Sequence, residues 1–207
     1  MVNTSKKESK KEKILLHASD VFARYGYEKT TLDDIGKKCG LNKASLYYYF
    51  KNKEEIFVQV ISSETAIFIH ELQERTALIL SVEDKLIHYL NERIKRYEEV
   101  MNFTQLSMES LKKVKPLYLQ LYRKVKAKEI QFIAKLIQEG IRSGEIEEMN
   151  PTDLAESFIL ISDALKHEQM MQEAVYFEYQ YEEEKVEEKL KTIVSLIIKG
   201  LKPLDTL

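Results

Sequence analysis

The chain has only six glycines and three prolines among its 207 residues, and this shortage of turn-forming residues limits what it can fold into. A sandwich or barrel of short strands needs a turn about every ten residues. Long helices need far fewer turns, and they suit a sequence that is 32% charged and 44% hydrophobic. We therefore predict an all-α fold with about nine helices. The chain is long enough to form a small domain joined to a larger one.

Apolar side chains recur at helical spacing from residue 14 onward. Gly26 follows them as the residue that ends the first helix. Thr31 and Asp34 form a capping-box pattern at the start of a short second helix, which Gly40 ends. The apolar face of the first helix consists of Ile14, Leu15, Ala18, Val21, Phe22 and Tyr25.

A tight turn leads to a third short helix over residues 43–50, for which Asn42 is the N-cap. Leu46 and Phe50 are four residues apart and face inward. Asn52 and Glu55 cap a fourth, longer helix. Two short helices joined by a tight turn, with a packing helix before them, predict a helix-turn-helix. The outer face of the third helix, which faces a major groove in such motifs, carries Lys43, Ser45, Tyr47 and Tyr48.

Residues 30–56, TTLDDIGKKCGLNKASLYYYFKNKEEI, bring together many residue types at fixed spacings. This run resembles the DNA-binding head of the tetracycline-repressor (TetR) family of transcription regulators. The resemblance extends toward the amino terminus through Ile14, Ala18, Phe22, Gly26 and Tyr27.

Three positions depart from the pattern of the family. Gly36 and Cys39 stand where the family commonly has alanine, and Asn42 stands where it commonly has serine or threonine. Each departure keeps small or capping chemistry. In a helix interior, Gly36 is expected to cost about 0.5 to 1 kcal/mol relative to alanine.

The resemblance implies a sequence-specific DNA-binding transcription regulator, most often a repressor. It implies that Thr31 and Lys53 bind phosphate from helix starts and that Tyr47 and Tyr48 touch the DNA backbone. The residues that would approach the bases are Asn42, Lys43, Ala44 and Ser45. We assign Leu32, Ile35, Leu46, Phe50 and Phe22 to the small core beneath them.

The predicted domains are a helix-turn-helix domain over residues 1–55 and a helical effector-binding and dimerisation domain over residues 56–207. We expect an arm over residues 1–10 to be disordered, because the repeated Ser-Lys-Lys-Glu has no apolar residue to anchor it. Such an arm is either a solvated tail or a basic segment that lies along phosphates or in a minor groove.

The body should contain helices over residues 53–80, 82–101 and 117–140, the last of these opened by Pro116. Asn150 and Pro151 begin another helix with proline at its first position. The final helix has an apolar stripe that needs a partner, and the last two helices of each subunit are expected to form a four-helix dimer interface. The stripe consists of Val186, Leu190, Ile193, Val194, Ile197, Ile198 and Leu201.

A small apolar or amphipathic effector is implied by the resemblance, and flexible or aromatic side chains in the body would line its pocket. An alternative with the same fold is a regulator controlled by a protein partner or by no ligand. The candidate pocket residues, most of which are also ordinary core candidates, are Tyr97, Met101, Phe103, Met108, Tyr122 and Met170.

The charge is divided unevenly along the chain. Residues 1–60 carry 12 Lys/Arg against 8 Asp/Glu, and residues 61–207 carry 20 against 26. A basic head on an acidic body is typical of a protein that meets nucleic acid at one end. The partners we expect are a palindromic double-stranded DNA operator, a second copy of the chain and a small-molecule effector.

The rival class is an enzyme on a helical scaffold, and the sequence offers no acid–base, nucleophile or cofactor pattern for it. The histidines lack the paired spacing of metal ligands, so we predict no metal site. A single cysteine, Cys39, favours a reducing compartment, and no apolar run is long enough for a membrane span. We therefore expect a cytoplasmic protein without a cofactor. The four histidines are His17, His70, His88 and His167.

Overall fold

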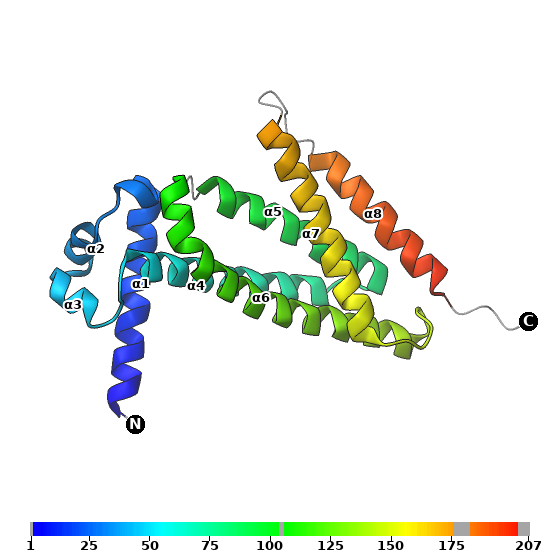
Figure 1. The fold of residues 1–207 in the computed structure, drawn as a ribbon. Coiled ribbons are helices and arrows are strands. Elements are labelled where there is room, and N and C mark those ends of the chain that lie inside the picture. Colours follow the sequence, from blue (N-terminus) through cyan, green and yellow to red (C-terminus); the bar gives the residue numbers. More distant parts are fainter. Residues whose placement is uncertain (1, 104–105, 176–182, 203–207) are drawn as a thin grey trace, which may run out of the picture. The chain divides into compact units, whose positions relative to one another are not determined.

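Figure 1 shows the computed structural model, in which every regular element of the described chain is a helix. The structure describes residues 2–103, 106–175 and 183–202, with the backbone alone for residues 2–6, 97–103, 108, 111, 169–175 and 183. The all-α prediction is confirmed, with a helix number close to the one expected. The helices of the described residues are α1 (Val2–Lys29), α2 (Leu32–Cys39), α3 (Lys43–Tyr47), α4 (Lys53–Ala77), α5 (Val82–Phe103), α6 (Met108–Ser143), α7 (Pro151–Val175) and α8 (Glu183–Gly200).

The chain packs as two compact units. The first unit consists of Met1–Phe68 and Glu98–Lys124, and the second of Ile69–Tyr97 and Val125–Leu207. Helices α4, α5 and α6 each contribute to both units. The unit that holds the helix-turn-helix is therefore larger than the predicted head, because it also includes the start of α4 and parts of α5 and α6.

The expected disorder of residues 1–10 is wrong for the described part of this segment, because α1 begins at Val2. Lysine and glutamate have high helix propensity. A segment that continues an existing helix also avoids the cost of nucleating a new one. The segment therefore needs no apolar anchor of its own to be helical.

Of two helix boundaries predicted from glycine and proline, one is wrong and the other agrees with the backbone. Pro116 lies inside α6, which starts eight residues before it at Met108, so this proline does not open the helix. Gly26 does interrupt α1, since its φ of 74° and ψ of 163° are not helical. The last residues of α1, up to Lys29, form a short separate turn after this glycine.

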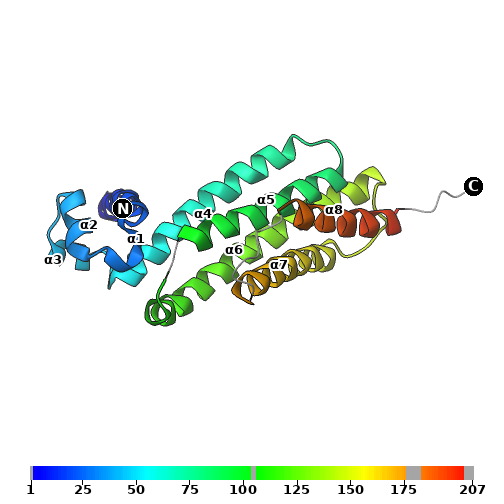
Figure 2. The same cartoon turned by 90° about the horizontal axis from the view of Figure 1, so that it is seen from above.

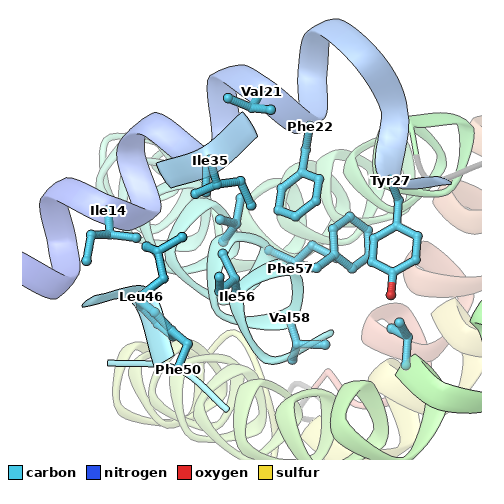
Figure 3. Packing of buried hydrophobic residues seen from close by; sticks show 14 residues of the cluster. Ile14, Val21, Phe22, Tyr27, Ile35, Leu46, Phe50, Ile56, Phe57 and Val58 are labelled. Atoms are coloured by element: carbon cyan, nitrogen blue, oxygen red, sulfur yellow. The ribbon is translucent and has the colours of Figure 1, made fainter. Parts of the chain in front are cut away.

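The first unit has one apolar core, which Figure 3 shows from close by. It joins the inner face of α1 to α2, α3 and the first turns of α4. Phe22, Tyr27 and Phe57 form an aromatic group in which neighbouring ring centroids lie 4.7 to 6.0 Å apart. Of the predicted core residues, Phe22, Ile35, Leu46 and Phe50 are at most 2% exposed, and Leu32 is partly buried against them.

The structure explains why glycine stands at position 36, which the sequence pattern alone did not. A Cβ atom at this position would lie 2.6 Å from the backbone oxygen of Leu41, which is closer than real Cβ contacts. The turn after α2 folds back here, and the N–H of Leu41 donates to the carbonyl of Gly36 at 2.8 Å. Glycine at position 36 therefore permits the tight turn between α2 and α3, which offsets its low helix propensity.

In the second unit, α7 and α8 lie side by side, as both ribbon views show (Figures 1 and 2). Asn150 caps α7 through its side chain, which accepts from the N–H of Thr152 at 3.0 Å, and Pro151 takes the first helical position as predicted. The fully buried core residues of this unit include Leu86, Leu90 and Ile94 from α5, Ile133 and Ile137 from α6, Ala155, Phe158 and Ile159 from α7, and Leu190 and Val194 from α8.

The same unit buries a cluster of charged side chains from α5, α6 and α7. Arg93 donates from Nε to Glu129 at 3.0 Å, from Nη1 to Ser162 at 3.0 Å, and from Nη2 to Asp163 at 2.9 Å. The ammonium of Lys126 donates to the second oxygen of Asp163 at 3.0 Å. Arg93 and Glu129 are 8% and 4% exposed, so this ion pair lies in the interior.

Two further polar groups complete the cluster. The buried hydroxyl of Tyr89 donates to Glu129 at 3.3 Å. Lys166 is 8% exposed and lies 3.7 Å from Asp163. Burial, together with the positive charge of Arg93, lowers the pKa of Lys166 to about 8. The cluster thus joins three helices through hydrogen bonds that an apolar core would not provide.

Candidate nucleic-acid interface

The α2–turn–α3 segment is built from local capping interactions. The hydroxyl of Thr31 accepts from the N–H of Asp34 at 3.2 Å, and the Asp34 carboxylate accepts from the N–H of Thr31 at 2.9 Å. Gly40 ends α2 with a φ of 66°, in the left-handed region that favours glycine. Asn42 then caps α3 by accepting from the N–H of Ser45 at 2.8 Å. These contacts confirm the predicted starts of α2 and α3.

The side chains of α3 and the residues after it divide into an inner and an outer face. Leu46 and Phe50 point into the core of the first unit, as Figure 3 shows. Tyr47 and Tyr48 are 52% and 67% exposed. The predicted DNA-facing residues Asn42, Lys43 and Ala44 are also exposed, and Ser45 is half-buried. The fold therefore exposes Asn42 at the N-cap of α3 and Lys43 and Ala44 in its first turn, while Ser45 is partly covered.

The two residues expected to bind phosphate from helix starts already have partners within the chain. The hydroxyl of Thr31 also donates to Asp34 at 2.6 Å, and these hydrogen bonds lower the pKa of Asp34. The ammonium of Lys53 donates to the carbonyls of Tyr27 and Thr30 at 2.8 and 3.0 Å. An ammonium has three N–H groups, so one of them is not used by these two bonds.

Lys53 fastens the end of α1 to the start of α4. Besides its two hydrogen bonds, its ammonium lies 4.0 Å from the ring centroid of Tyr27. Burial lowers the pKa of Lys53 and raises the pKa of Tyr27, whose hydroxyl donates to Glu54 at 3.1 Å. The helix-turn-helix is therefore held to α4 by polar contacts in addition to the aromatic core.

Two basic features of the first unit were not predicted. A groove of about 590 Å³ between α1 and α2 has Arg24, Lys29, Lys37 and Lys38 along its lining, together with Asp20 and Asp34. In addition, the ammonium of Lys7 lies 4.5 Å from the ring centroid of Tyr48. The lysine pairs were visible in the sequence, but their positions beside the helix-turn-helix depend on how α1 packs.

A carboxylate of α1 caps the start of α6 within the first unit. Glu28 accepts from the N–H of Ser107 at 2.8 Å and from the hydroxyl of Ser110 at 2.9 Å. These hydrogen bonds lower the pKa of Glu28. Sequence reasoning missed this contact because its partners are about eighty residues apart along the chain.

The candidate effector residues are mostly outside what the structure describes. The side chains of Tyr97, Met101, Phe103, Met108 and Met170 are not described, although their backbones lie in α5, α6 and α7. Tyr122 is half-buried on α6, and its ring stacks on that of Tyr118 with centroids 6.5 Å apart. The pocket remains a prediction.

The predicted dimer stripe of α8 is divided by the fold of the subunit. Leu190, Val194 and Ile198 are at most 2% exposed, so their surface is already covered within the chain. Val186, Ile193, Ile197 and Leu201 are half-buried. Leu196 was not predicted for the interface, and it is 66% exposed.

Residues 14–60 match the sequence model of bacterial regulatory proteins of the tetR family. This match covers α1 from Ile14, the helix-turn-helix and the start of α4. The DNA-binding head of the chain belongs to the TetR family. The protein is therefore a helix-turn-helix transcription regulator that binds DNA.

Three known proteins illustrate the relationship. The TetR-family head is 46% identical over 59 residues to IcaR, the negative transcriptional regulator of the biofilm operon icaADBC in Staphylococcus epidermidis, covering 28% of this chain and 32% of IcaR. A transcriptional regulator from Cytophaga hutchinsonii has a crystal structure with a TM-score of 0.72 and 27% identity over 93% of this chain and 98% of its own. The regulator FadR of Bacillus subtilis, solved in complex with stearoyl-CoA, shares the fold at a TM-score of 0.56 and 21% identity. This likeness covers 92% of this chain and 98% of FadR.

No group of three or more His, Cys, Asp or Glu side chains in the described part of the chain is placed to hold a metal ion. None of the helices described is long and apolar enough to cross a membrane.

Proposed function

We propose that this TetR-family regulator is a homodimeric repressor that binds a palindromic operator and is released from it by a small amphipathic molecule. The observation that carries the proposal is the outer face of α3, where Lys43, Tyr47 and Tyr48 are exposed above a core formed by Leu46 and Phe50. The likeness of the head to IcaR, a negative regulator, supports repression as the direction of control.

The DNA-reading role rests on the chemistry of this face. A helix-turn-helix places the first residues of its second helix at the base edges. Asn42, Lys43 and Ser45 occupy these positions and offer hydrogen-bond donors for the major groove. Tyr47 and Tyr48 lie one turn later, where their hydroxyls would meet phosphates.

The homodimer is supported by apolar surface on α7 and α8. Leu160 on α7 is 65% exposed and Leu196 on α8 is 66% exposed, and Ile193 and Ile197 beside Leu196 are half-buried. A stable interface typically buries about 1,600 Å², and exposed apolar residues on adjacent helices are a common way to supply it. Two such helices from each subunit would form a four-helix interface.

We expect Leu196→Glu to convert the dimer into a monomer at micromolar concentration, because it places a charge without a partner in the apolar interface. Leu16→Glu is a matched control, since Leu16 on α1 is also 66% exposed. Sedimentation velocity, with circular dichroism to check the fold, distinguishes the two variants. A dimeric Leu196→Glu protein would place the interface elsewhere.

The effector step is supported by the FadR complex with stearoyl-CoA and by the flexible and aromatic residues in the predicted pocket. An acyl chain suits an adaptable apolar cavity, and a polar headgroup would remain at its mouth. We therefore take acyl-CoA thioesters as the first effectors to test. A regulator that answers a protein partner or no ligand is the alternative.

The thermodynamic linkage between effector binding and operator binding provides a test of this proposal. An effector that weakens operator binding by some factor must itself bind more weakly, by the same factor, when the operator is present. The operator is first selected by the protein from random duplexes. Binding of stearoyl-CoA is then measured by calorimetry on the free and the operator-bound protein, and we expect a weaker affinity for the second.

Coenzyme A and stearate, tested separately, serve as controls for the two halves of the ligand. Lys43→Ala should bind stearoyl-CoA as well as the wild type does, because α3 is remote in sequence from the predicted pocket. Equal affinity of stearoyl-CoA for the free and the operator-bound protein would contradict the repressor-release mechanism. Absence of binding by any acyl-CoA of a chain-length series would favour the alternative.

A further inference from the structure

We infer that the amino-terminal turns of α1, residues 2–13, form a second DNA-binding element that contacts phosphates beside the groove occupied by α3. This inference rests on the proposed role of α3 as the DNA reader. It assigns a function to a segment that lies outside the part of the chain matching the family, which begins at residue 14.

The segment continues the inward-facing side of α1 but carries lysines in place of apolar residues. Lys7 and Lys11 precede Ile14 at the helical spacing of that face. The ammonium of Lys7 lies 4.5 Å from the ring centroid of Tyr48, and that of Lys11 lies 5.5 Å from the ring centroid of Phe50. The segment therefore lies against Tyr48 and Phe50, which follow directly after α3.

Two more lysines lie at the other end of α3. Lys10 and Lys13 line a groove of about 330 Å³ together with Leu41, in the turn that leads into α3. Lys7 and Lys10 are exposed, and so is Tyr48. The lysines of the segment thus lie close to both ends of the helix that is proposed to enter the major groove.

The composition of the segment identifies an anionic polymer as its partner. Residues 2–13 contain five lysines, two glutamates and a single aliphatic residue, Val2. An amphipathic membrane helix needs a large apolar face, and a protein interface of this size needs apolar anchors. Phosphates need only cations, and the DNA bound by α3 brings them to this place.

The length of the segment fits the geometry of DNA. From Ile14 to Val2 the helix rises about 18 Å, at about 1.5 Å per residue. One turn of the double helix is about 34 Å, so this distance is roughly half a turn. Figure 1 shows these first turns of α1 extending past α3. The segment is therefore long enough to reach from the major groove to the phosphates of the neighbouring minor groove.

The test compares salt dependence in full-length variants. Each phosphate contact makes the slope of log K against log salt more negative by about 0.9. Lys7→Gln combined with Lys10→Gln should therefore flatten the slope by about 1.8 per subunit on the selected operator with long flanking DNA. The matched control is Lys128→Gln combined with Lys135→Gln, two exposed lysines of α6 in the second unit.

A second duplex, trimmed to the two half-sites without flanking base pairs, locates the contact. On this duplex the protein with Lys7→Gln and Lys10→Gln and the wild type should show the same slope of log K against log salt. Equal slopes on the long duplex, or a difference that persists on the trimmed one, would overturn the inference. If the variant differed from the wild type in sedimentation but not in the salt slope, the segment would bind protein and not DNA. That result would also overturn the inference. If the wild type itself shows no salt-dependent DNA binding, the proposed function fails, and the inference fails with it.

Discussion

Lys43→Ala and Tyr47→Ala should each weaken operator binding at least tenfold while leaving the fold intact. A side chain that contacts a base or phosphate contributes about 1 to 3 kcal/mol, and 1.4 kcal/mol corresponds to about a tenfold change in affinity. A dimer loses the contact twice. Both side chains are exposed, and the ammonium of Lys43 approaches Asp33 to 4.0 Å at the surface, a contact that contributes little to stability.

Fluorescence anisotropy on the selected operator, with thermal melting followed by circular dichroism, measures both properties. Leu46→Ala is the informative contrast, because Leu46 is 1% exposed and its truncation should lower the melting temperature together with DNA binding. Lys128→Ala, at an exposed position of α6, controls for the loss of one positive charge. Wild-type affinity in both the Lys43 and the Tyr47 variant would remove α3 as the reader of the operator.

Glu129→Gln should destabilise the protein by about 3 kcal/mol, which corresponds to a melting temperature lower by about 10 °C. Glu129 is 4% exposed and accepts from Arg93 at 3.0 Å and from Tyr89 at 3.3 Å. Removing its charge leaves the guanidinium of Arg93 buried with less compensation. A buried ion pair loses far more stability when one partner is removed than a surface pair does.

The same helix provides a matched control for this prediction. Glu139 also lies on α6 and also pairs with a cation of α5, accepting from Lys85 at 2.9 Å, but it is 54% exposed. Glu139→Gln should therefore cost less than about 1 kcal/mol. Equal melting temperatures for the two variants, measured under the same conditions, would show that the interior cluster contributes no more than a surface ion pair.

The sequence by itself determined the features that depend on neighbouring residues. The caps at Thr31, Asn42 and Asn52 each act on an N–H three residues later, so the residue types alone locate the helix starts. The inward and outward faces of the recognition helix follow from helical periodicity, which placed Leu46 in the core and Tyr47 at the surface. The helix-turn-helix, the all-α class and the family resemblance were all predictable on this basis.

The amino-terminal segment shows where a local argument failed. Its lack of apolar residues predicts disorder, but a lysine- and glutamate-rich segment can continue a helix that the core has already formed. Its contacts with Tyr48 and Phe50 were beyond prediction, because they depend on the angle at which α1 crosses α3.

Only the tertiary structure decided which distant residues meet. Arg93 pairs with Glu129 and Asp163, which lie 36 and 70 residues further along the chain, and no periodic pattern links such positions. The need for glycine at position 36 comes from the approach of the Leu41 carbonyl, a contact set by the turn and not by helix propensity. Packing likewise divided the apolar stripe of α8, since Leu190, Val194 and Ile198 face their own subunit and leave Leu196 exposed. The physical reason is common to all three cases: a sequence pattern specifies which side of a helix is apolar or charged, and packing specifies what that side contacts.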